Sequence, residues 1–170
     1  MAFDPPPPLT GSGFSVLAMT QADRAALIAA AGDPLIWAGH PAVERYRPEV
    51  FEPYFDFLVS AGGAVTLRKE DEVIGCSRFY PVPDQPSAIG IGFTFITCQH
   101  WGGNANRAIK ALMTDYAFSK VPEVWFHIAP TNIRSQKATA KLGATFEYQA
   151  RLDLGTGPTD WMCYRLRHSA

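Results

Sequence analysis

The sequence predicts one domain of the α/β (α+β) class, with a mixed sheet flanked by helices. Residues 89–95 alternate large apolar side chains with glycine and threonine, which is the period of a β-strand. Residues 64–68 and 73–80 are β-prone runs on either side of a charged turn, a pattern typical of a hairpin. Residues 48–60 and 105–116 instead space their apolar side chains for one face of a helix. Strands and helices therefore follow one another along the chain.

Local signals set the bounds of these elements. Thr20, with Asp23 three residues later, favours the start of a helix, and Asn132 favours another. Gly143 fits the left-handed position after a helix end. In chain order we expect a proline-rich arm at residues 1–8, strand 13–19, helix 20–31, loop 36–41, helix 48–60, hairpin 64–80, loop 81–86, strand 89–98, turn 101–106, a helix, strand 123–128, helix 132–143 and hairpin 144–166.

The composition excludes several classes of protein. The 170 residues are 47% hydrophobic and 12% aromatic, which is enough for a substantial core and excludes a disordered chain. A net charge of −1 argues against nucleic-acid binding over the whole surface. Cys76, Cys98 and Cys163 lack any zinc or redox spacing, which favours apolar packing in a reducing compartment over a nucleophile. Without a signal peptide or an apolar run of about 18 residues, we expect a cytoplasmic protein with no membrane partner.

The stretch from His100 to Met113 carries the strongest functional signal. A turn rich in glycine and asparagine opens directly into a helix, whose free N–H groups point into the turn and can bind phosphate. Helix starts usually carry acids, yet the first charges here are Arg107 and Lys110. The next helix repeats the pattern, since its charged residues from 132 to 141 are all basic. The two basic helix starts indicate either a bound anion or two solvated basic faces.

Several motifs together resemble the GNAT superfamily of N-acetyltransferases, and in particular its branch of ribosomal-protein N-terminal alanine acetyltransferases. They are WGGNANR at 101–107, HIAPT at 127–131 and NIRSQKATAKLGA at 132–144, with IGCSRFY at 74–80 and IGFTF at 91–95 upstream. The resemblance covers the chain from about Leu9 onward. It therefore implies an arm at residues 1–8 and a single acetyltransferase domain at residues 9–170. It also implies a mostly antiparallel sheet, in which two splayed parallel strands beginning near 89 and 123 form the acetyl-CoA cleft.

The resemblance implies acetyl-CoA as the cofactor, with its diphosphate on the backbone of the turn. The family motif Q/R-x-x-G-x-G/A maps onto residues 101–106, where Asn104 and Asn106 replace glycine and a small residue. Asparagine tolerates a left-handed backbone, so we expect the turn to keep its shape. The expected cofactor-binding residues are Phe95, Ile96, Thr97, Trp101, Gly102, Gly103, Asn104, Ala105, Asn106, Arg107, Asn132, Ser135 and Lys141.

Acyl transfer from a thioester to an amine needs a polarised carbonyl and a stabilised leaving thiolate. We expect a backbone N–H between Phe95 and Thr97 to polarise the carbonyl. Many GNAT enzymes use a tyrosine for the thiolate, and its position is Thr139 here. The resemblance to the alanine acetyltransferase branch implies Ser135 in this role, and a solvated serine in a first helical turn is the alternative.

The acceptor amine must also be neutral. The glutamate that relatives carry before the central strand is replaced by Gly90, which leaves His127 as the nearby side chain that titrates around neutrality. The alternative is a hydrogen-bonded core or rim histidine, with deprotonation through water. We expect the acceptor site to be shaped by Trp37, Arg78 and Tyr80, together with His40.

The sequence thus predicts an enzyme, an acetyl-CoA-dependent N-acetyltransferase. Its acceptor would be a primary amine, either a peptide or protein N-terminus or a small molecule, which attacks directly in a ternary complex. One alternative is a catalytically weak or regulatory CoA-binding protein. Another is an interaction protein that uses the arm and the aromatic helix. No metal or nucleic acid is expected, and a homodimer is compatible with the sequence.

Overall fold

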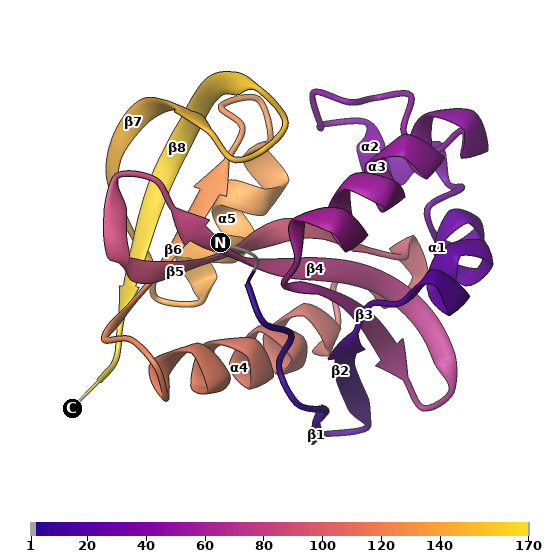
Figure 1. Ribbon diagram of the computed structural model, residues 1–170, viewed down its shortest axis with the longest axis horizontal. Coiled ribbons are helices and arrows are strands. Elements are labelled where there is room, and N and C mark those ends of the chain that lie inside the picture. Colours follow the sequence, from indigo (N-terminus) through magenta and orange to yellow (C-terminus); the bar gives the residue numbers. More distant parts are fainter. Residues whose placement is uncertain (1–2, 170) are drawn as a thin grey trace.

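The computed structural model of the protein describes residues 3–169, whose strands form an eight-stranded sheet in the order β1-β2-β3-β4-β5-β6-β8-β7 (Figure 1). β5 and β6 are parallel, and the other neighbouring strands are antiparallel. The predicted mixed, mostly antiparallel sheet is therefore confirmed. The strands are β1 (Leu9–Gly11), β2 (Phe14–Ala18), β3 (Ala64–Lys69), β4 (Glu72–Val82), β5 (Gln85–Ile96), β6 (Glu123–Ile128), β7 (Thr145–Asp153) and β8 (Pro158–Arg167).

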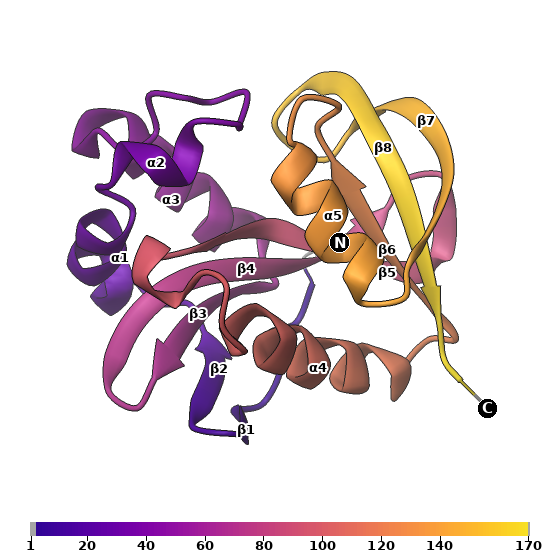
Figure 2. The same cartoon turned by 180° about the vertical axis from the view of Figure 1, so that it is seen from behind.

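Helices cover both faces of this sheet (Figures 1 and 2). The group on one face is α1 (Arg24–Ala30), α2 (Pro34–Trp37) and α3 (Pro48–Ala61), and the group on the other is α4 (Ala105–Phe118) and α5 (Ile133–Lys141). Within residues 3–169, no helix is long and apolar enough to cross a membrane.

The sheet separates two hydrophobic clusters. On the α4 face, Ile109 and Met113 of the helix pack with Ile91 of β5 and Phe126 of β6. On the opposite face, the aromatic side of α3 packs with α1 and with Phe95 of β5. Helical spacing at 48–60 therefore predicted the right buried face. The alternation at 89–95 predicted the strand but not its faces, because Ile89 and Ile91 lie in the cluster on the α4 face and Phe95 lies in the other, with the bulge at Phe93 between them.

The two parallel strands separate soon after they begin. Ile89 pairs with Val124 and Gly90 with Trp125, and the register ends there. Three residues later Phe93 takes a φ of +54°, and the β5 register with β4 shifts at this point. A β-bulge of this kind bends a strand, while a left-handed phenylalanine costs on the order of 1–3 kcal/mol. The bend turns the second half of β5 away from β6 and opens the sheet between them.

Several local predictions need correction. The expected loop at 36–41 begins inside α2, because Asp33 caps that short helix by accepting a hydrogen bond from Leu35 N. The expected loop at 81–86 is mostly strand, since β4 continues to Val82 and β5 begins at Gln85. The strand expected at 89–98 ends at Ile96, so Cys98 lies in a 3-10 turn.

The N-terminal segment is only partly the solvated arm that its prolines predict. Its first two residues lie outside the described part of the chain. Phe3 forms an isolated bridge with Gly62 and its ring stacks on Phe79, with the ring centroids 6.0 Å apart. Pro6 is also buried. Residues 3–8 are thus attached to the domain at two points.

Candidate active site

The gap between β5 and β6 continues into a cleft of about 1430 Å³. One end lies at the turn before α4, and the other lies under the β7–β8 hairpin, where Leu154 and Trp161 line it. The start of α5 and the segment after α2 form its sides. The cleft therefore joins the predicted phosphate-binding turn to a separate chamber on the far side of the sheet.

The turn before α4 exposes its backbone to the cleft. Gly102 has a φ of +73°, and neither it nor Gly103 has a heavy atom within 4 Å of where a β-carbon would stand. The first turn of α4 contains no acid, and Arg107 lines the cleft beside it. Free N–H groups, a helix dipole and a guanidinium thus meet in an open space, which is the arrangement that binds phosphate. The left-handed residue is Gly102, whereas Asn104 has a φ of −92°, so the substitution of glycine at 104 costs the turn nothing.

Trp101 links this turn to its neighbours. Its indole Nε1 donates to Ile96 O at 2.8 Å, and the Arg134 guanidinium stacks on the indole with 3.6 Å between Cζ and the ring centroid. Arg134 also donates to Ile36 O at 3.3 Å. The beginning of α5, the end of β5 and α2 are therefore held around the phosphate-binding end of the cleft.

The β5 backbone supplies a free donor to the cleft at Ile96. Thr97 N donates to Ile74 O of β4 at 2.8 Å, so that N–H is already used. Successive N–H groups of a strand point to opposite edges, which turns the Ile96 N–H toward the open side facing β6. Of the three positions expected to polarise a carbonyl, Ile96 has the suitable direction.

Tyr80 and His127 form a buried pair at the other end of the cleft. The Tyr80 hydroxyl lies 2.7 Å from His127 Nδ1, and both residues line the cleft. Burial lowers the pKa of His127 to about 4, against a weaker opposing effect of Asp84, so its ring is neutral near pH 7. Its Nε2 is buried without a hydrogen-bond partner in the described chain. A neutral imidazole with one unused nitrogen is suited to accept a hydrogen bond from a substrate amine.

The bare face of β5 at Gly90 and Gly92 serves this pair. A β-carbon at Gly90 would stand 2.2 Å from Tyr80 Cε2, and one at Gly92 would stand 3.2 Å from Cε1. The space that the small residues leave is therefore occupied by the Tyr80 ring. The bare face of β5 is thus covered by a side chain of the neighbouring strand β4.

Most of the site residues predicted from the sequence line this one cleft. They are Trp37, Tyr80, Phe95, Ile96, Trp101, Gly102, Gly103, Asn106, Arg107, His127, Asn132, Ser135 and Lys141, with His40. Asn104 and Ala105 stand behind the turn rather than on the cleft wall, because Asn104 is the N-cap and Ala105 is buried in the core.

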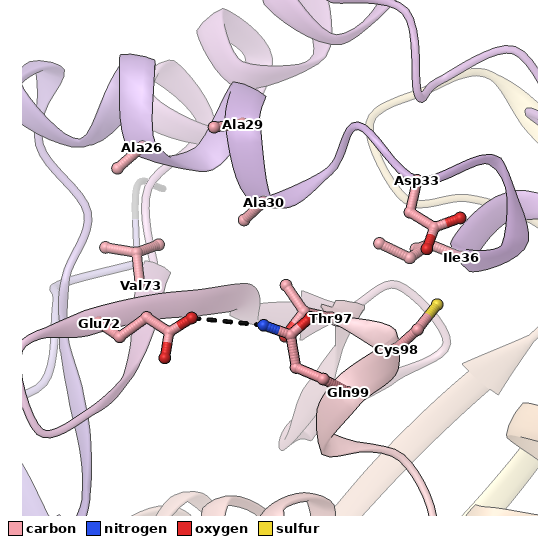
Figure 3. A pocket seen from close by; sticks show the side chains of 10 residues that line it. All are labelled: Ala26, Ala29, Ala30, Asp33, Ile36, Glu72, Val73, Thr97, Cys98 and Gln99. Carbon is pink, nitrogen blue, oxygen red and sulfur yellow. Dashed lines mark hydrogen bonds between the residues drawn. The ribbon is translucent and has the colours of Figure 1, made fainter.

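Arg78 and Thr97 lie elsewhere. Arg78 is buried, and its guanidinium donates to Gly62 O at 2.9 Å and to Leu154 O at 3.4 Å. These bonds join β4 to the end of α3 and to the β7–β8 hairpin. Arg78 therefore holds together elements that surround the cleft. Thr97 lines a separate hollow of about 430 Å³ between α1 and the β4–β5 sheet, near Cys98 and the Gln99–Glu72 hydrogen bond (Figure 3).

Lys110 and Asp160 are among the charged cleft residues that were not identified as site residues from the sequence. Lys110, counted there as a helix-start charge, is buried beneath β5 and lines the cleft. The sequence feature that could have identified Lys110 is its helical spacing from Thr114 and Ala117, with which it forms one buried row along α4. Asp160, on β8, is the one carboxylate among the cleft-lining residues of the described chain.

The comparisons with known proteins agree with this geometry. The acetyltransferase (GNAT) domain family matches residues 16–145, and no curated relative matches the chain by sequence. A GCN5-related N-acetyltransferase from Brucella melitensis superimposes with a TM-score of 0.79 at 16% identity, over 95% of this chain and 78% of that chain. RimJ from Mycobacterium smegmatis, in complex with a CoA disulfide, gives 0.66 at 15% identity over 95% and 86%. RimL, a ribosomal-protein alpha-N-acetyltransferase in complex with coenzyme A, gives 0.70 at 16% identity over 95% and 98%.

The chain belongs to the GNAT acetyltransferase family. Acetyl-CoA, the cofactor of these enzymes, is thereby confirmed as the cofactor predicted from the sequence. The residues of the cleft fit it: the turn at Gly102 presents bare backbone where a β-carbon would obstruct a diphosphate, and Arg107 and Lys141 add positive charge along the wall.

Proposed function

We propose that the protein is an N-acetyltransferase that transfers the acetyl group of acetyl-CoA to a primary amine by direct attack in a ternary complex. The observation that carries this proposal is the continuity of the cleft. It places the phosphate-binding turn at Gly102 and the Tyr80–His127 pair at opposite ends of one channel through the sheet. Donor and acceptor can thus be held at once on the two sides of the gap.

The chain's residues divide the work along this channel. The backbone at 102–107 binds the diphosphate, and Ile96 N–H donates to the thioester oxygen as negative charge develops there. Much of the rate comes from holding donor and acceptor together, since effective molarities in well-aligned systems are worth about 7–11 kcal/mol. Ser135, half-buried on the α5 wall, places a hydroxyl beside the cofactor end.

The acceptor chamber suits a positively charged amine that loses its proton on binding. Tyr80 and Trp161 supply aromatic walls, and Asp160, which also lies 3.8 Å from Arg151 Nη1, supplies a carboxylate at the rim. Aromatic faces and a rim carboxylate attract an ammonium group. The amine loses its proton to water, and His127 Nε2 accepts a hydrogen bond from the neutral amine while Tyr80 holds the ring through Nδ1. The fold shared with two ribosomal-protein acetyltransferases supports a peptide or protein N-terminus as the first acceptor class to test.

Two measurements test the proposal. Acetyl-CoA at millimolar concentration should raise the unfolding midpoint by several degrees, because a ligand that binds only the folded state stabilises it. Free thiol should then appear when peptides with free N-termini or small primary amines are added. No midpoint shift would overturn cofactor binding. A shift without thiol release from any acceptor would instead favour a CoA-binding protein without useful turnover.

A further inference from the structure

Lys110 is a buried cation in the wall of the cleft. It is 7% exposed, it lines the cleft, and no carboxylate of the described chain forms an ion pair with it. A buried ammonium without an acid is rare, since removing a charge from water is costly. Hydrogen bonding of the ammonium within the chain is also incomplete, because an ammonium has three donors and one bond is found, to Thr94 Oγ1 at 2.7 Å.

The contacts of Lys110 form a directed chain of hydrogen bonds. Lys110 Nζ donates to Thr94 Oγ1, which lies 2.7 Å from Ser77 Oγ. Ser77 in turn donates to Gly92 O at 3.2 Å. The chain ends at the β5 bulge, where Phe93 turns the strand away from β6. Lys110 is thus held by β4 and β5 at the point where the sheet opens.

This position lies along the cleft from the phosphate-binding turn. Lys110 follows the N-cap Asn104 by six residues, about 9 Å along the α4 axis. Thr94 precedes Thr97 by three residues, about 10 Å along β5. The extended arm that joins the diphosphate of coenzyme A to its thioester must leave the turn in this same direction to reach the acceptor chamber. Lys110 therefore stands under the thioester end of the arm.

The opposite wall lacks an acid for the leaving group. Thr139 of α5 is buried in the cleft wall where many family members carry a tyrosine, and an aliphatic hydroxyl does not give up a proton at neutral pH. Lys110 reaches the same gap from α4, the neighbouring helix on this face (Figure 2). Burial lowers the pKa of the Lys110 ammonium to about 7, an effect that the Cys76 thiol partly opposes. A thiol such as that of cysteine titrates at about 8.5, close enough to Lys110 for a proton to pass between the two groups. When both groups are charged, each stabilises the charged form of the other.

We propose that Lys110 is the proton donor to the leaving sulfur, a role that rests on the proposed acetyl transfer. The acceptor nitrogen forms a bond to the carbonyl carbon, the carbon–sulfur bond breaks, and its electron pair stays on sulfur. Lys110 Nζ gives one proton to that sulfur. The proton that the acceptor nitrogen sheds passes to solvent, from which Lys110 regains its own. The products are an amide and a free thiol.

The inference is tested without turnover by the ionisation of bound coenzyme A. Ultraviolet absorbance of the thiolate, measured against bound desulfo-CoA, gives the pKa of the bound thiol. The wild-type protein should lower it by about 1.5 units, which for a free thiol pKa of about 8.5 corresponds to about tenfold tighter binding of the ionisable ligand at pH 8. The other charged groups that line the cleft, and that remain in the variant, are Arg45, Arg107 on α4, Arg134, Lys137 and Lys141 on α5 and Asp160 on β8. His127 on β6 also lines the cleft, in its neutral form. An unshifted thiol in the wild-type protein overturns the inference by itself, whether or not a variant folds.

The variant Lys110→Met distinguishes the effect of this lysine on the bound thiol from the effect of the other charged residues of the cleft. The wild-type protein should bind CoA about tenfold more tightly than desulfo-CoA at pH 8, and Lys110→Met should bind the two within twofold. The matched control is Lys137→Met, which removes an exposed lysine from the same cleft. It should weaken both ligands equally and keep their ratio.

Two outcomes tell the inference apart from the proposed function. If the wild-type protein binds neither ligand, the proposed function and the role of Lys110 fall together. If it binds both equally well, or if Lys110→Met keeps the tenfold preference, cofactor binding stands and Lys110 is only a buried structural lysine.

Discussion

The Tyr80 ring lies directly against the backbone of Gly90, with its Cε2 atom 2.2 Å from where a β-carbon on that glycine would stand. Position 90 is where relatives place a glutamate, so a side chain there would compete with Tyr80 for one space. The hydroxyl of the same ring bonds to His127 across the gap between β5 and β6. The missing acid on β5 and the tyrosine on β4 are thus two parts of one arrangement.

Gly90→Ala should therefore destabilise the protein by about 1–3 kcal/mol, the usual cost of an overpacked core. Urea unfolding measures it. Gly103→Ala is the control, because nothing lies within 4 Å of its β-carbon position and it lacks a positive φ. In a Tyr80→Ala background the cost of Gly90→Ala should largely vanish; equal costs in both backgrounds would show that the ring does not fill this space.

Gly102→Ala should weaken CoA binding about tenfold. An L-residue held at the φ of +73° costs about 1–2 kcal/mol, and relaxing that strain turns the phosphate-binding amides. Isothermal titration measures the affinity. Gly157→Ala is a matched control, with a φ of +94° and open space in the β7–β8 turn, at the opposite end of the cleft from the phosphate-binding turn. It should show the same backbone strain with CoA affinity unchanged, and equal losses in the two variants would contradict the assignment.

Stability should fall in mild acid because of two buried histidines. Burial lowers the pKa of both His40 and His127 from 6.5 to about 4. Below pH 6.5 these histidines bind protons in the unfolded chain but stay neutral in the folded chain. The free energy of unfolding is therefore highest above about pH 6.5 and falls as the pH is lowered toward 4. Each histidine contributes on the order of 3 kcal/mol at most. His127→Gln, which can still bond to Tyr80, should flatten the slope between pH 6.5 and 4; an unchanged slope would mean that His127 titrates normally.

Ser135→Ala should slow turnover about tenfold and leave CoA affinity within twofold. A hydrogen bond to a charged group is worth about 1.5–3 kcal/mol, and the thiolate carries its charge only as the reaction proceeds. The helix itself should survive, because the cap bond at the start of α5 joins Asn132 Oδ1 to the Ser135 backbone N–H and not to its hydroxyl. Steady-state kinetics measures the turnover rate, and titration with CoA measures the affinity. An unchanged rate would show that the Ser135 hydroxyl does not stabilise the leaving thiolate.

The elements with strong periodicity were predictable from the sequence. The helical spacing at 48–60 and the left-handed Gly143, with its φ of +92°, each follow from local sterics and burial. The alternation at 89–95 predicted the strand but not the change of face at the Phe93 bulge, which depends on pairing with β4. The short helix α2 was missed because four residues are too few for a periodic signal, and the cap that starts it is a single aspartate. The strands through 81–86 were missed because Pro81 and Pro86 read as a loop, although both ends of that hairpin are paired.

The site was predictable where it depends on backbone and less so where it depends on packing between elements. A glycine-rich turn opening a helix indicates a phosphate site whatever surrounds it. Sequence spacing does not indicate that Tyr80 fills the space over Gly90, or that Arg78 turns its guanidinium to carbonyls of α3 and β7–β8. Lys110 was interpreted only as one of the basic charges at the helix starts, which indicated either a bound anion or a solvated basic face. In each case the partner is distant in the chain, so only the folded structure identifies it.

The central claim is that backbone amides between residues 102 and 107 bind the diphosphate of acetyl-CoA. A titration of isotope-labelled protein with CoA, followed by amide proton chemical shifts, tests it most directly. We expect large downfield shifts at Gly102, Gly103 and the first residues of α4, since these amides would gain a charged acceptor. Binding of CoA that leaves these amides unshifted would contradict the account.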